Sequence, residues 1–243
     1  MKSFALGLLI PLAACSFSSS SDAEGTAVAA QGSGGARSFQ VTDFTGIALK
    51  GSDDIDVRVG TGFSVRAEGP TAELDKLRID KDGSTLNVGR KNRTGLNWSG
   101  GSKVKVFVTL PRLIEANVAG SGNMTVDRVE GSKFDGGIAG SGNLQVAALQ
   151  VEEAAFSIAG SGNATAAGTA KALKIEIAGS GNVEGSKLQA RSATVAIVGS
   201  GDATAVVNGA AQVDMMGSGD VDLGPNAHCK VSKMGSGSVR CAN

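Results

Sequence analysis

The sequence contains no tyrosine, one tryptophan and eight phenylalanines among its 243 residues. Aromatic side chains bury the largest apolar area per residue, so the usual material of a thick, spherical core is scarce here. Hydrophobic residues nevertheless make up 41% of the chain and charged residues 19%, a composition that argues against disorder. The core must therefore consist of small and branched aliphatic side chains, which favours a thin, layered fold.

Neither sign of charge is in excess, because Lys and Arg total 23 and Asp and Glu also total 23. Such a chain has no overall field that would attract a polyanion, and we predict no nucleic-acid partner. One local basic cluster, Arg90, Lys91 and Arg93, adjoins Asn92 and Gly95. We interpret it as a solvated loop.

Histidine is equally scarce, and His228 is the only one. A Ser-His-Asp or Cys-His arrangement could use no other base, and the sequence shows neither a nucleophile elbow nor a P-loop. One histidine and few thiols also argue against a zinc site. We expect no catalytic residues, and we expect His228 to cap the end of the fold.

The N-terminus has the pattern of an export signal. Lys2 precedes an apolar run from Phe4 to Ala14, which is too short to span a bilayer and typical of a signal peptide. The run ends in Leu12-Ala13-Ala14-Cys15, which resembles the bacterial lipoprotein lipobox. The resemblance implies cleavage after residue 14 and lipidation of Cys15. The alternative is an ordinary signal peptide with an incidental cysteine.

The residue after Cys15 is Ser16 rather than an aspartate, which by analogy with Gram-negative lipoproteins favours the outer membrane. Residues 15–37 are rich in Ser, Gly and Ala and have few apolar side chains to bury. We therefore predict a signal peptide over 1–14, a lipid-anchored flexible tether over 15–37 and one folded domain over 38–243.

The strongest pattern is a repeat. Gly-Ser-Gly occurs seven times after residue 119, beginning at Gly120, Gly140, Gly160, Gly179, Gly199, Gly217 and Gly235. Successive copies are 20, 20, 19, 20, 18 and 18 residues apart. A flexible linker would explain one copy but not seven at near-constant spacing. Self-similarity at such a period is typical of a solenoid.

The segments beside each Gly-Ser-Gly alternate in polarity with period 2, as half-buried strands do. Two residues before it stand Val118, Ile138, Ile158, Ile177, Ile197, Met215 and, in the last copy, Lys233. Each repeat therefore contains two strands that meet at a sharp corner, where glycine reaches positive φ and lets backbones stack closely. We predict an all-β fold: a parallel β-helix, or solenoid, with coils of about 18–20 residues and Gly-Ser-Gly corners.

The residue after each corner forms a predicted ladder of Asn123, Asn143, Asn163, Asn182, Asp202 and Asp220. The asparagines should stack and share amide hydrogen bonds, a structural role. Asp202 and Asp220 would lie about 4.8 Å apart. Like charges this close repel, so one is protonated, or they splay apart, or a cation such as calcium lies between them. Calcium is the one cofactor that the sequence raises, although the nine-residue period of calcium-binding β-rolls is absent.

Two cysteines fall on the inward register of the last coil, on opposite sides of its corner. In an oxidising envelope we expect Cys229 and Cys241 to form a disulfide that closes the open end, worth about 2–4 kcal/mol. The alternative is a pair of buried free thiols.

The first half is less regular, and we interpret it as earlier coils. Alternation predicts strands over 39–50, 55–59, 63–68, 77–79, 86–88 and 104–110, and Gly51-Ser52-Asp53-Asp54 looks like a degenerate corner. A short helix is expected between Pro70 and Leu77, with Pro70 near its start and Glu73 in its first turn.

Several segments together carry a family resemblance. In order they are Phe44-Thr45-Gly46-Ile47, Gly51-Ser52-Asp53-Asp54-Ile55, residues 65–70, 83–88 and 106–111, and the Gly-Ser-Gly-Asn series. Together they resemble the auto-transporter adhesin head GIN domain family, over roughly residues 38 to 243. The resemblance implies a parallel β-helical fold and an exported, often lipid-anchored protein. It supplies no catalytic residues.

The leading hypothesis is a non-catalytic envelope or cell-surface lipoprotein with a role in adhesion. It would bind the membrane through its lipid anchor and a polysaccharide or protein through its solenoid, facing the periplasm or the cell exterior. One alternative is a carbohydrate-active β-helix enzyme that uses carboxylates among Asp202, Asp214, Asp220 and Asp222. Another is a self-assembling architectural protein, a homo-oligomer stacked through unpaired terminal strands.

Overall fold

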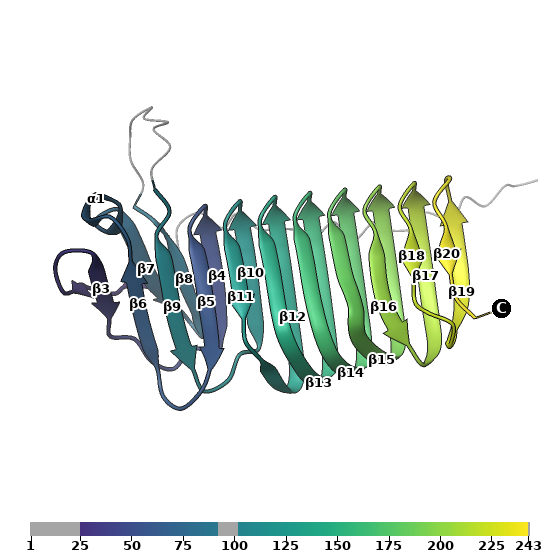
Figure 1. The fold of residues 1–243 in the computed structure, drawn as a ribbon, viewed down its shortest axis with the longest axis horizontal. Helices are drawn as coiled ribbons and strands as arrows, with labels where there is room; N and C mark the ends of the chain where they lie inside the picture. Colours follow the sequence, from purple (N-terminus) through teal and green to yellow (C-terminus); the bar gives the residue numbers. More distant parts are fainter. Residues whose placement is uncertain (1–24, 92–101, 243) are drawn as a thin grey trace, which may run out of the picture.

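The computed structural model describes residues 25–91 and 102–242, and these form a long β-solenoid (Figure 1). The sole helix of this described part is α1 (Thr71–Leu74). It begins after Pro70, as the sequence predicts. No helix in the same residues is long and apolar enough to cross a membrane. The all-β solenoid prediction is confirmed.

The regular part of the solenoid stacks parallel strands in sequence order. Its strands are β10 (Glu115–Gly120), β11 (Asn123–Val126), β12 (Val129–Gly140), β13 (Asn143–Gly160), β14 (Asn163–Gly179), β15 (Asn182–Gly199), β16 (Ala203–Val207), β17 (Gly209–Gly217), β18 (Val221–Asp222), β19 (Ala227–Met234) and β20 (Val239–Arg240). Equivalent residues pair directly, so that Gly120, Gly140, Gly160, Gly179, Gly199 and Gly217 lie in one row. The repeat spacing in the sequence is therefore one coil of the solenoid.

At each corner the backbones of successive coils lie unusually close. The N–H groups of Ser161 and Gly162 both donate to the carbonyl of Gly140, at 2.9 and 3.0 Å. The first glycine of every corner has a positive φ, such as 129° at Gly160. A Cβ added to Gly160 would lie 2.4 Å from that same carbonyl oxygen. Glycine is required here both for its conformation and for the space it leaves.

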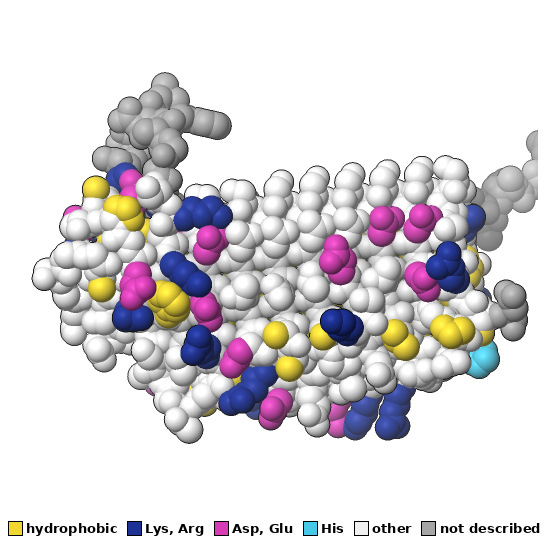
Figure 2. Space-filling view, viewed as in Figure 1, with side chains coloured by type: hydrophobic (Ala, Val, Ile, Leu, Met, Phe, Trp, Pro, Cys, Tyr) yellow, Lys and Arg dark blue, Asp and Glu magenta, His cyan; other side chains and the backbone are white. Residues whose placement is uncertain are grey.

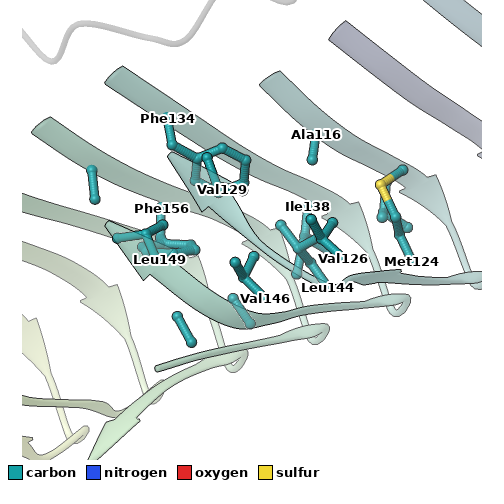
Figure 3. Packing of buried hydrophobic residues seen from close by; sticks show 14 of the residues in the cluster. Ala116, Met124, Val126, Val129, Phe134, Ile138, Leu144, Val146, Leu149 and Phe156 are labelled. Atoms are coloured by element: carbon teal, nitrogen blue, oxygen red, sulfur yellow. The ribbon is translucent and has the colours of Figure 1, made fainter. Parts of the chain in front are cut away.

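The core consists of stacked columns of buried aliphatic side chains (Figure 3). The column two residues before the corner contains Ile138, Ile158, Ile177 and Ile197, each at most 3% exposed. Two phenylalanines, Phe134 and Phe156, pack edge to face with ring centroids 6.0 Å apart. Gly136 makes room for the second ring, because a Cβ there would lie 3.1 Å from Phe156. The thin aliphatic core expected from the composition is what fills the solenoid.

The N-terminal part corrects the prediction of simple earlier coils. Its strands are β1 (Thr26–Ala27), β2 (Ala30–Gln31), β3 (Ala36–Phe39), β4 (Gly46–Gly51), β5 (Asp54–Val59), β6 (Ser64–Glu68), β7 (Leu77–Asp82), β8 (Thr85–Arg90) and β9 (Lys105–Leu110). Only β4, β5, β8 and β9 join the parallel stack. In contrast, β6 is antiparallel to β3 and β9, and β7 is antiparallel to β8.

The order of these strands in space also differs from their order in the sequence. β8 and β9 pair with β4 and β5 on the side away from the regular coils, whereas β10 and β11 pair with the other side. The chain therefore forms the β4–β5 coil, folds back to cover its outer side, and then returns to continue the solenoid. The antiparallel strands and α1 close this end of the core (Figure 1).

Two predicted boundaries are wrong for related reasons. The single strand predicted over 39–50 is split into β3 and β4, with a turn at Asp43, where φ is 60°. The predicted tether over 15–37 extends too far, because β1 pairs with β7 and β2 pairs with β3. In both cases pairing with strands that are distant in the sequence sets the boundary, which local alternation could not show. Residues 15–24, including Cys15, lie outside the described residues.

The prediction that Arg90 belongs to a solvated basic loop is wrong, because Arg90 is paired with Asp53 and Glu73. Its guanidinium binds the Asp53 carboxylate through two bonds of 2.9 and 2.5 Å and also pairs with Glu73. Asp53 is 1% exposed and accepts a further bond from the Val104 N–H at 2.9 Å. The hydrogen bonds that Arg90 donates to Asp53 raise the pKa of Arg90 still further above neutrality, so the guanidinium is always charged. A buried carboxylate needs such a partner, which makes Arg90 part of the N-terminal closure.

The corner geometry leads to a prediction for Gly160→Ala. The substitution should destabilise the fold in two ways, through backbone strain of roughly 1–3 kcal/mol and through the clash with the Gly140 carbonyl. Gly131→Ala is the matched control, because Gly131 has a φ of 141° but nothing within 4 Å of an added Cβ. Denaturant unfolding should therefore show a loss for Gly160→Ala that exceeds the control by at least about 2 kcal/mol. Equal losses would mean that close stacking of the corners contributes nothing.

Candidate functional site

The residue after each corner forms a ladder of side chains along one edge of the solenoid. The Nδ2 groups of Asn143, Asn163 and Asn182 each donate to the Oδ1 of the preceding asparagine, at 2.8, 3.2 and 3.0 Å. The amides therefore stack as the sequence predicts.

The ladder begins one coil earlier than the Gly-Ser-Gly pattern indicates. Asp54 pairs in register with Asn123 and accepts its Nδ2 at 2.8 Å. Burial disfavours the charged form of Asp54, but hydrogen bonds from Lys103 and Asn123 outweigh it and hold its pKa below the ordinary value. Gly51-Ser52-Asp53 is thus the first corner, with the second glycine replaced. The degenerate corner, which the sequence already shows, was the signal from which the predicted ladder could have been extended to Asp54.

The two aspartates at the C-terminal end of the ladder, Asp202 and Asp220, are bonded differently from the asparagines. The Oδ1 of Asn182 accepts a hydrogen bond from the backbone N–H of Asp202 at 2.9 Å. In the same way, the Oδ1 of Asp202 accepts one from the backbone N–H of Asp220 at 2.7 Å. Asp220 in turn accepts both the hydroxyl and the N–H of Ser238, at 2.7 and 2.9 Å. These bonds from Ser238 lower the pKa of Asp220, which keeps the exposed carboxyl group ionised at neutral pH.

Calcium gains no support from this arrangement. One oxygen of each carboxylate already accepts hydrogen bonds from the next coil. Among residues 25–91 and 102–242, no group of three or more His, Cys, Asp or Glu side chains gathers as a metal site would require. Asp202 and Asp220 by themselves offer too few ligands for a calcium ion, which takes six to eight oxygens.

The remaining aspartates proposed for catalysis also have partners. Asp214 accepts a hydrogen bond from Gln212 at 2.8 Å, and Asp222 forms an exposed ion pair with Arg240 at 2.9 Å. The lowered pKa of Asp220 is the opposite of what a general acid needs. Within the described residues, nothing in this geometry favours a glycosidase.

The last coil brings the two cysteines together. Cys229 in β19 and Cys241 after β20 form a disulfide, with a Cα–Cα distance of 6.1 Å. Both side chains are half-buried against the end of the core. His228 lies exposed beside Cys229, in register with Ala210 of β17.

A shallow groove of about 530 Å³ crosses the outer sheet face of β12 to β15. Two ion pairs lie along it, Lys133–Asp135 and Lys174–Glu176, each 2.9 Å long. Its other lining side chains are Glu153, Ala154, Ala155, Ser157, Ala172, Leu173, Ser192, Ala193 and Thr194. The groove combines polar side chains with small apolar ones and contains no aromatic side chain, so it offers hydrogen bonds but no surface for ring stacking against a ligand.

Charges of both signs are interspersed on the face seen in Figure 2, while the row of corners along its upper edge is uncharged. The side-chain pattern on this face fits the balanced composition and shows no extended patch of one sign.

The ladder geometry predicts different effects on stability for two reverse exchanges, Asn163→Asp and Asp202→Asn. Asn163→Asp should place a carboxylate against the Oδ1 of Asn143 and remove a donor, costing about 1–3 kcal/mol. Because the folded state raises the pKa of the new carboxyl, the loss should appear as pH rises above about 4 and fade below it. Asp202→Asn should be tolerated, since its amide can still accept from Asp220. Denaturant unfolding at pH 3 and pH 7 tests both; equal stability of the two variants at pH 7 would contradict the ladder.

The disulfide closes a loop with a sequence separation of 12 residues. Reduction should destabilise the last coil by about 2–4 kcal/mol, with a much smaller effect on coils farther from it, because solenoid stability depends mainly on nearest neighbours. Hydrogen exchange with and without reductant should show faster exchange in β19 and β20 and little change in β13. Uniform acceleration along the chain would show that the solenoid unfolds as one unit.

The solenoid has the same fold as several solved proteins. A "putative adhesin" from Bacteroides fragilis superposes with a TM-score of 0.74 at 21% identity, over 85% of this chain and 95% of that one. A "putative lipid binding protein" from Parabacteroides distasonis gives 0.69 at 23% identity, over 88% and 98%. A "putative adhesin" from Parabacteroides merdae gives 0.62 at 18%, over 86% and 95%.

A search of curated protein sequences found no match. The family model described as "Putative auto-transporter adhesin, head GIN domain" matches residues 43–227. This range begins after β3 and covers β4 to β18, with the Gly-Ser-Gly corners up to Gly217 and the Asn/Asp ladder, and it ends where β19 begins. The match spans more than half of the chain, and the fold is the one that the resemblance implies. The protein belongs to the auto-transporter adhesin head GIN domain family.

Proposed function

We propose that the protein is an exported, lipid-anchored module of the cell envelope that acts by binding, in an adhesion-type role, rather than by catalysis. The observation that carries this proposal is the groove across β12 to β15, a surface of mixed polar and small apolar side chains built on a stack of strands. Family membership supports an envelope or surface role. The acidic residues raised for catalysis all have hydrogen-bond or ion-pair partners.

The groove favours an extended polar ligand, either a polysaccharide or a polypeptide. Its hydroxyl groups, Ser157, Ser192 and Thr194, and its paired charges offer donors and acceptors at the regular spacing of the coils. The pKa of Lys133 is raised by its hydrogen bond to Asp135, so this ammonium group remains charged. A ligand could exchange its own groups for such exposed pairs at little cost, since each contributes under about 1 kcal/mol.

Anchoring is proposed to depend on Cys15, whose lipidation would make membrane attachment stable when more than one acyl chain is present. The chain enters the solenoid at its closed N-terminal end, because β1 pairs with β7 and β3 pairs with β6. The open end at β19 and β20 would then lie farthest along the solenoid from the anchor.

Anchoring and exposure can be tested together on intact cells. The full chain should fractionate with the outer membrane and be digested by external protease. Cys15→Ala should move it to the soluble fraction, with the same fold by circular dichroism. Protection from protease until the outer membrane is opened would restrict the protein to the periplasm and contradict adhesion to external partners.

The groove is tested separately. Cells that display the protein in a form that external protease digests are allowed to bind a surface coated with polysaccharide or protein. Replacing Lys133 and Lys174 together by glutamate should reduce binding severalfold by reversing the charge pattern of the groove. Lys187→Glu is the matched control, because Lys187 is exposed in β15 but does not line the groove. Equal binding by both variants would exclude the groove as the contact surface.

A further inference from the structure

The two ends of the solenoid differ in how their strands are covered. At the N-terminal end, the antiparallel strands β6 and β7 cover β9 and β8. At the C-terminal end, β19 pairs only with β17, and β20 only with β18, among the described residues (Figure 1). The N–H of Ala242 donates to the carbonyl of Ala227 at the start of β19. The rest of the outer edge of β19 has no strand partner within the described chain.

Apolar side chains are exposed at this same end. Four large hydrophobic residues are exposed in the described part of the chain, and all lie in the last three coils: Val198, Met216, Val231 and Met234. Val198, Met216 and Met234 stack in register, at 55%, 53% and 68% exposure. Along the inward column, Val213 is fully buried, but Val231 one coil later is 45% exposed. One more strand would bury Val231 and lengthen the stack that ends at Met234.

The last coil is also basic. After Asp222 the sequence contains no acidic residue, whereas β19 carries Lys230 and Lys233 and β20 carries Arg240. Arg240 is paired with Asp222, and Lys233 donates to the Gly237 carbonyl at 2.6 Å. Lys230 forms no ion pair with any other described residue. The edge therefore combines an unpaired backbone with apolar side chains and an excess of positive charge.

We propose that the free edge of β19 is a docking site for an extended segment of another protein, rich in alternating acidic and apolar residues, which adds to the sheet as one further strand. Strand addition satisfies the unpaired backbone groups and leaves side-chain chemistry to set specificity. Because side chains alternate between the two faces of a strand, apolar residues of the segment cover Val231 on the inward face, and its acidic residues lie beside Lys230 on the outward face. A second copy of this chain is a poorer occupant, because it would bring two identical basic edges together.

The proposal concerns a surface separate from the groove on β12 to β15 and does not depend on cell-surface exposure. It is tested with the full chain and a fluorescein-labelled octapeptide of alternating glutamate and valine, blocked at both termini. Fluorescence anisotropy should show saturable binding that weakens as salt is added. A peptide with lysine in place of every glutamate should bind at least about tenfold more weakly.

Variants locate the binding. Lys230→Glu should weaken binding of the acidic peptide about tenfold, while Lys187→Glu, which changes the same charge in β15, should leave it unchanged. The proposal is overturned by no binding, by equal binding of the two peptides, or by equal loss in the two variants. It is also overturned if light scattering shows a dimer that Lys230→Glu alters, since the edge would then be occupied by a second copy.

Discussion

The solenoid depends on one backbone contact, repeated at the corners from Ser121 to Ser218. In coil after coil, the N–H of the corner serine donates to the carbonyl of the first glycine one coil earlier, at 2.9 to 3.0 Å from Ser121 to Ser218. In several coils the next glycine donates to the same oxygen. The approach leaves no room for a Cβ on either glycine. Because this contact fixes the position of each coil on the one before, it also aligns the amide ladder outside and the aliphatic columns inside.

The strands at the two ends of the stack are paired and covered differently from those in its middle. In the middle, every strand has a partner on both sides, and small variations such as Gly136 beside Phe156 are absorbed by the core. The N-terminal end uses antiparallel strands, α1 and the Asp53–Arg90–Glu73 cluster to close the core. Among the described residues, the C-terminal end is covered by the disulfide, the Lys233 side chain and the Ala242 N–H, which donates to the Ala227 carbonyl. An open strand edge is a liability unless something binds it, which is the physical basis of the strand addition proposed for β19.

The sequence predicted the part of the fold in which each position repeats. Ile138, Ile158, Ile177 and Ile197 occupy equivalent places, so their spacing shows both that they are strand residues and that they are neighbours. In the N-terminal part, alternation predicted strands such as β6 and β9 but could not show that they pair antiparallel. Likewise, Arg90 lies 37 residues from Asp53, and no local pattern connects them. By contrast, Asp54 follows the degenerate Gly51-Ser52-Asp53 corner, so the repeat could have placed it one coil before Asn123 although the two are 69 residues apart.

The most direct test of the corner contact is amide hydrogen exchange at Ser141, Ser161 and Ser180. Their side chains are exposed to solvent, yet each N–H donates to a glycine carbonyl of the preceding coil at 2.9 Å. Their amides should therefore exchange as slowly as those of the buried strand residues Ile158 and Ile177, with exchange limited by opening of the coils. Exchange at the rate of an unstructured peptide would show that the corners are not joined, and that the core alone holds the coils together.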